Sequence, residues 1–294
     1  MKKRIFSILL VAALVITGTI GATGMSVSAA EENAASISDT VRASANSIRV
    51  LSDTEIAYLS NLPDNIVSTK EGYEQAEKYR LEAVRLAEKG IEKLVSQSQL
   101  LRLDTVNLGT DRTFYDAGWG VYWSETWGTI DDGNCYSTSY LEQNQDEANI
   151  MLMAGAGGAA SIAWVGNQFT VSGSGSQQAN ISMSVDYVGY LDAYAVPGGS
   201  VGINIDLVIR DDTTETEYST EILDYSIGLG SNQWDVSINA GDSLVLQAGH
   251  QYTVYLALTA SAGISGIGYI VNDWGRFDAD TGQYANYSYI NIDF

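Results

Sequence analysis

Residues 201–210 read VGINIDLVIR, and this stretch decides the fold. Apolar residues occupy every second position from Val201 to Ile209. Period-two alternation predicts a β-strand with one face buried and the other face wet or half-covered. The same alternation recurs over residues 181–188, 252–259 and 287–292, so we expect several strands of this kind.

Turn-forming residues separate these stretches, at 172–176, 197–199, 211–214, 239–242 and 280–282. Gly, Pro, Asn and Asp dominate them, each because it suits a turn backbone. Roughly nine short strands in about 180 residues, with no clear helix among them, indicate an antiparallel sandwich. The predicted fold class is therefore mainly β: a jelly-roll-like antiparallel β-sandwich preceded by an amphipathic α-helical segment.

Charge divides the chain into two units. Residues 1–112 hold 13 basic and 14 acidic residues, whereas residues 113–294 hold two basic and 22 acidic residues. We therefore expect an acidic β-sandwich domain over 113–294. The net charge of −21 argues against binding to nucleic acid or to anionic membrane surfaces, because their phosphates would be repelled.

An amphipathic helix is predicted over residues 68–103. Its apolar residues share one face at about 100° per residue, and charged residues occupy the other face. We expect this face to pack on the C-terminal domain or in a hairpin with residues 53–61. A coiled-coil stalk or oligomer seam is the alternative.

The first 29 residues read as a secretory signal peptide. A basic start at residues 2–4 precedes an apolar run over 5–20 and small residues up to Ala29. This pattern predicts cleavage and a secreted, extracellular protein, with no transmembrane helix left after the signal. A small-residue-rich segment over 30–67 follows.

A cluster of aromatic residues near the start of the acidic domain is the first candidate site. Trp119, Trp123 and Trp127 are spaced by four, and Tyr115 precedes them. Aromatic rings with a polar rim suit carbohydrate, so these four are candidate ligand-binding residues. The alternative is that the rings cap the sandwich core or receive the N-terminal helix.

Acidic turns suggest a second candidate site. Asp278 and Asp280 form a D-x-D-x-G arrangement with Asp273 just upstream, which could hold Ca²⁺. A plain polar turn is the alternative, since the full EF-hand spacing is absent. One cysteine and one histidine exclude disulfide frameworks and multi-histidine metal sites. The glycine-rich residues 154–158 lack a phosphate-loop ending and predict a strand that another element approaches closely.

These observations favour a secreted, non-enzymatic β-sandwich that binds a ligand or associates with a surface, with a carbohydrate or a cell-surface component as partner. Three alternatives stay open. The abundant carboxylates allow a glycan hydrolase, which needs two carboxyl groups facing one cleft. The helix allows a structural or assembly protein. The terminal Phe294, with Ile292 and Ile290 before it, allows an outer-membrane β-barrel.

Overall fold

The computed structural model describes residues 69–97, 103–274 and 283–294. Within these residues, one α-helix precedes nine strands that form a single sheet. The elements are α3 (Lys70–Gln97), β1 (Asp104–Asn107), β2 (Arg112–Phe114), β3 (Trp119–Tyr140), the 3₁₀ turn η1 (Leu141–Gln143), β4 (Gln145–Ser172), β5 (Ser176–Asp211), β6 (Thr216–Ile227), β7 (Gly230–Gln247), β8 (Gln251–Trp274) and β9 (Tyr284–Asp293). The mainly β fold with a preceding helix is confirmed.

The strands are longer than the sequence predicted. The expected turns at 197–199 and 239–242 lie inside β5 and β7, which continue through them. The signal peptide, the segment 30–67 and the proposed hairpin partner at 53–61 lie outside the described residues. Within the described part of the chain, no helix is both long enough and apolar enough to cross a membrane.

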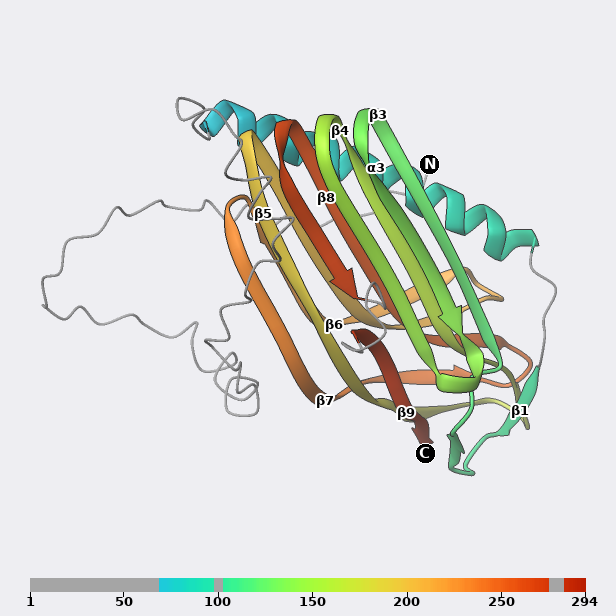
Figure 1. The fold of residues 1–294 in the computed structure, drawn as a ribbon. Helices are drawn as coiled ribbons and strands as arrows, with labels where there is room; N and C mark the ends of the chain where they lie inside the picture. The colour runs from blue at the N-terminus through green and yellow to red at the C-terminus, as the bar shows by residue number, and fades with distance from the viewer. Residues whose placement is uncertain (1–68, 98–102, 275–282) are drawn as a thin grey trace, which may run out of the picture. The chain divides into compact units, whose positions relative to one another are not determined.

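The sheet folds back on itself along one line. Side chains bridge residues of the same strand that are far apart in sequence: Asn272 Nδ2 donates to the Ser261 carbonyl oxygen (3.0 Å), and Ser139 Oγ donates to that of Val121 (3.2 Å). An extended strand would hold the second pair about 60 Å apart. Figure 1 shows β3, β4, β8 and β5 curling over at their upper ends.

The bends lie in register across four strands. Ile130 of β3 pairs with Gly155 of β4, Gly155 pairs with Gly266 of β8, and Gly266 pairs with Pro197 of β5. Gly155 (φ 143°) and Gly266 (φ 115°) adopt positive φ values that side chains disfavour. The fold line therefore depends on glycines that meet across the sheet.

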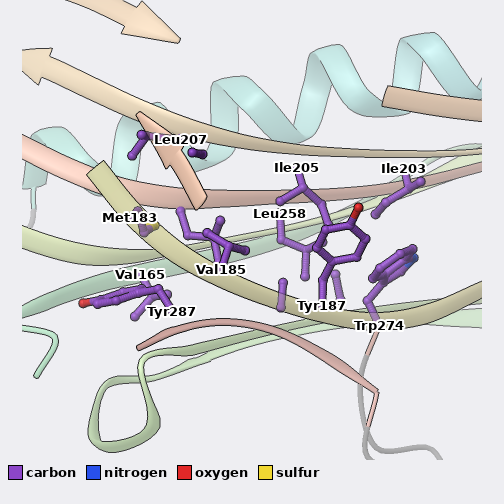
Figure 2. Packing of buried hydrophobic residues seen from close by; sticks show 14 of the residues in the cluster. Val165, Met183, Val185, Tyr187, Ile203, Ile205, Leu207, Leu258, Trp274 and Tyr287 are labelled. Carbon is purple, nitrogen blue, oxygen red and sulfur yellow. The ribbon is translucent and has the colours of Figure 1, made fainter. Parts of the chain in front are cut away.

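This folding creates two layers. The helix-side layer comprises β6 and residues 119–130, 156–172, 198–211 and 251–265. The outer layer comprises β7, β9 and residues 131–140, 145–154, 176–196 and 267–274. The main core lies between them, and Figure 2 shows Ile203, Ile205 and Leu207 of β5 packing with Val185 and Tyr187 of the same strand. The predicted sandwich is thus one doubled sheet.

Helix α3 covers the outside of the helix-side layer. Thr69 caps the helix, because its Oγ1 accepts a hydrogen bond from Gly72 N (3.0 Å). The buried face that the periodicity predicted carries fully buried Ala76, Ala83 and Ala87. The helix can approach the sheet closely because glycines lie underneath it. Gly158 is next to the Tyr79 carbonyl, and Gly263 is next to the Ala76 carbonyl. The predicted close approach of another element to residues 154–158 is therefore that of the helix.

We predict that Gly263→Ala destabilises the protein by about 1–3 kcal/mol. A Cβ at this position would overlap with the Ala76 carbonyl oxygen, so the helix must shift away from the sheet. Urea unfolding followed by circular dichroism measures the change. Gly241→Ala on β7 is the matched control, because its Cβ would lie 3.0 Å from the nearest backbone oxygen, that of Ile181. Equal losses in the two variants would contradict the prediction.

Candidate functional site

The predicted tryptophan stripe lies beneath the helix. Trp127 packs against Tyr79 of α3, with ring centroids 5.3 Å apart, and Trp119 packs against Tyr255 (5.4 Å). Trp123 lies against Gly90 of the helix. The structure therefore brings the three tryptophans onto one face, where helix packing accounts for them.

Tyr115 lies apart from this stripe, in the loop between β2 and β3, and its side chain is 67% exposed. Ligand binding by Tyr115, Trp119, Trp123 and Trp127 stays a prediction.

The predicted metal ligands are only partly described. Asp278 and Asp280 lie outside the described residues, whereas Asp273 lies near the end of β8. Within residues 69–97, 103–274 and 283–294, no group of three or more His, Cys, Asp or Glu side chains could hold a metal ion. Calcium binding therefore stays a prediction.

The outer layer carries a different aromatic surface on the side away from the core. On β5, Leu191, Ala193 and Ala195 enter the core, so the alternating residues Tyr190, Asp192 and Tyr194 point outward. The same alternation on β3, β4, β7 and β8 defines what we name the tyrosine–carboxylate face. Its residues are Tyr136, Glu147, Asn149, Tyr190, Asp192, Tyr194, Gln233, Tyr269 and Asp273.

The strand register sets these side chains in rows. One row runs Tyr136, Asn149, Asp273, Tyr190 and Gln233 across five neighbouring strand segments. Strands lie about 4.8 Å apart, so roughly 14 Å separates the two tyrosines of this row. Tyr194 and Tyr269 form a directly opposed pair towards the fold line. Aromatic rings therefore flank a polar centre.

Burial differs along the face. Asp192 is 1% exposed, and Glu147 and Asp273 are equally buried, whereas the rings of Tyr136 and Tyr190 are half-buried. Gln145 Nε2 donates to Glu147 Oε1 (2.8 Å). Burial raises the pKa of Tyr136, and the nearby charge of Glu147 raises it further. The phenol therefore stays protonated at neutral pH and can donate a hydrogen bond.

Sequence reasoning missed most of this face. The sequence indicates Asp273 only as a metal ligand. Tyr136 belongs to the aromatic-rich stretch 114–140 but is not one of its four candidate ligand-binding residues, and the sequence does not predict the tyrosines of β5 and β8 as site residues. Tyr190 and Tyr194 lie four residues apart with Asp192 midway, which on a strand places all three on one side. That spacing was the available signal. The pairing of Tyr190 with Asp273 depends on β5 and β8, which are distant in sequence.

Two groups elsewhere have local roles. His250 Nδ1 lies 2.8 Å from Asp211 Oδ2, and Asp211 Oδ1 accepts a hydrogen bond from Thr213 N (3.0 Å). The pair joins the turn after β5 to the turn before β8. Cys135 is half-buried, and burial together with Glu125 raises the pKa of its thiol. A raised pKa disfavours the reactive thiolate.

Another group of carboxylates lies where β5 pairs with β6. Asp206 is directly opposite Glu221. Burial raises the pKa of Asp206 to about 7, and the charges of Glu221 and Asp224 add to this effect. Asn204 Nδ2 donates a hydrogen bond to Asp206 Oδ1 (3.5 Å), and this bond partly offsets the rise in the pKa of Asp206.

No protein-family model and no curated protein matches the chain. Among solved structures, the chain is similar to the enzymatically active domain of tailspike protein 4 from bacteriophage CBA120, with 8% identity and a TM-score of 0.21 over 52% of this chain and 18% of that chain. It is also similar to the CBM22-1–GH10 modules of Clostridium thermocellum xylanase 10B complexed with xylohexaose, with 13% identity and a TM-score of 0.17 over 67% of this chain and 29% of that chain. A third similar structure is BiXyn10A CBM1, with 8% identity and a TM-score of 0.17 over 61% of this chain and 99% of that chain. The chain thus spans less than a third of the length of the first two structures.

We predict that Asp206→Asn weakens the pH dependence of stability. Because the pKa of Asp206 is about 7 in the folded protein and about 3.9 in an unfolded chain, the folded state binds more protons between these values. Stability therefore falls as pH rises from about 4 to 7. Urea unfolding should show the variant more stable than wild type by roughly 1–3 kcal/mol at pH 8, and little changed near pH 4.

Asp235→Asn, at an exposed position on β7, is the control and should keep the wild-type difference between the two pH values. An Asp206→Asn variant with the wild-type pH profile would show that this carboxyl group does not titrate as proposed.

Proposed function

We propose that the protein is a secreted, non-enzymatic binding protein whose tyrosine–carboxylate face binds a carbohydrate. One observation carries the proposal: two tyrosines flank an amide and a carboxylate in a single row across one rigid sheet, as Tyr136, Asn149, Asp273 and Tyr190. Sugar rings place C–H groups against aromatic faces and hydroxyl groups towards carboxylates and amides, so this combination suits them.

The arrangement of the face favours ligand binding, because its side chains lie on paired strands and not on flexible loops. Every residue of the row lies on a strand paired on both sides, except Tyr136 on the edge strand β3 and Gln233 on β7. Paired strands hold their side chains at fixed spacings, which lowers the entropy lost when a ligand binds. Two tyrosines about 14 Å apart match an oligosaccharide better than a single sugar.

Secretion is part of the proposal, and the sequence supports it. The basic residues 2–4, the apolar run over 5–20 and Ala29 make up a signal peptide that would deliver the mature chain to polysaccharides outside the cell. The net charge of −21 favours uncharged partners over anionic ones.

We predict that Tyr190→Ala weakens retention on polysaccharide at least tenfold, because the ring that one sugar stacks on is removed. Affinity electrophoresis of the purified chain in gels containing soluble cellulose derivative, xylan, mannan or glycol chitin measures this. Tyr218→Ala is the matched control: Tyr218 is an exposed tyrosine on β6, in the other layer, and its loss should leave retention unchanged.

Two results would contradict the proposal. If the wild-type protein migrates equally fast in gels with and without each of the polysaccharides, carbohydrate binding at this face is excluded. Release of sugar reducing ends by wild type but not by Asp273→Asn would instead identify a carboxylate-based hydrolase.

A further inference from the structure

Resting on the proposed function, we infer that Asn149 is the specificity-determining residue of the tyrosine–carboxylate face and that its amide recognises hydroxyl groups of an uncharged oligosaccharide. Asn149 lies in the row between Tyr136 and Asp273.

The orientation of Asn149 follows from its neighbours. Ala148 and Ile150 enter the main core between the layers. Side chains alternate along a strand, so Asn149 points to the opposite side, into the tyrosine–carboxylate face. The register partner on β8, Asp273, points the same way.

The hydrogen bonding of Asn149 is the unusual feature. Its side chain is fully buried, and neither Nδ2 nor Oδ1 has a hydrogen-bond partner. It lies close enough to Tyr136 to lower the pKa of that phenol, but not in hydrogen-bond geometry with it. Most buried polar side chains in folded proteins are hydrogen-bonded, so an amide that lacks both partners at a recognition face indicates a ligand that supplies them.

The chemistry of an amide selects the class of ligand. Its nitrogen donates and its oxygen accepts, whereas the carboxylates beside it only accept. Adjacent hydroxyl groups on a sugar ring can accept from the nitrogen and donate to the oxygen at once. An anionic sugar would meet Glu147 and Asp273 in a chain of net charge −21, which disfavours it.

Ligand access requires side-chain movement. Asn149 has no exposed surface, while the rings of Tyr136 and Tyr190 on either side are half-buried. Rotamer changes at a binding surface are common when a ligand binds, even where the backbone moves little. A sugar stacked on each ring would place a middle sugar over Asn149 and Asp273.

The test replaces Asn149 with leucine, which has similar size and no polar group. Isothermal titration with cellohexaose, xylohexaose, mannohexaose and chitohexaose should show at least tenfold weaker binding than wild type for whichever of these wild type binds. The same variant should melt at a higher temperature, because an unpartnered amide has been removed. Wild type should bind hexagalacturonate at least tenfold more weakly than its best neutral ligand.

Asn167→Leu is the matched control. Asn167 is equally buried, but its Oδ1 accepts a hydrogen bond from Gly118 N (3.0 Å) and its Nδ2 donates to Tyr287 Oη (3.2 Å). This variant should therefore melt at a lower temperature than wild type. The opposite changes in melting temperature separate an amide that supports the fold from one that serves a ligand.

Three results would overturn the inference. Wild-type affinity in Asn149→Leu, with binding lost in Tyr190→Ala, would leave the proposed function intact and remove only the role of Asn149. A lower melting temperature for Asn149→Leu would show that the amide supports the fold. Equal binding of hexagalacturonate and neutral sugars would exclude the selectivity, and no binding of any sugar would overturn both proposals.

Discussion

Four bends in register let one β-sheet form both layers of the sandwich, and the rest of the structure depends on them. Because β3, β4, β5 and β8 pass through the fold line, each contributes side chains to both sides of the core. Gly155 and Gly266 pair with one another at this line in conformations that disfavour side chains. A doubled sheet keeps its backbone hydrogen bonds across the bend, where two separate sheets would need connecting loops.

Folding the sheet also creates two outer faces, and helix α3 covers one of them. The helix carries alanines where it meets Gly158 and Gly263, so its backbone approaches the strands closely. Arg80 spans this interface: it pairs with Glu77 (2.6 Å) and donates to Ser261 Oγ (2.8 Å). A charged side chain can lie at such an interface because its hydrogen bonds are satisfied there.

Local periodicity was enough to predict part of the structure. Alternation over 201–209 identified Ile203, Ile205 and Leu207 as core residues, and helical spacing identified the buried alanines of α3. Strand length was not predictable in this way. Residues 197–199 have turn chemistry, but pairing continues through them because Gly266 lies opposite. The candidate site could not be predicted from local sequence for the same reason, because the row from Tyr136 to Tyr190 forms only through pairings between segments that are distant in sequence.

The two outer faces of the sandwich differ in their chemistry. Trp119 and Trp127 contact other aromatic rings at 5.4 and 5.3 Å and fill the space beneath a helix, as large apolar rings do in a core. The tyrosines of the other face alternate with carboxylates and with the unpartnered amide of Asn149. Stability alone would favour an apolar residue at that position, because burying an amide without partners costs about 1–3 kcal/mol. The proposed recognition of ligand hydroxyl groups would account for an amide there, beside the half-buried rings of Tyr136 and Tyr190.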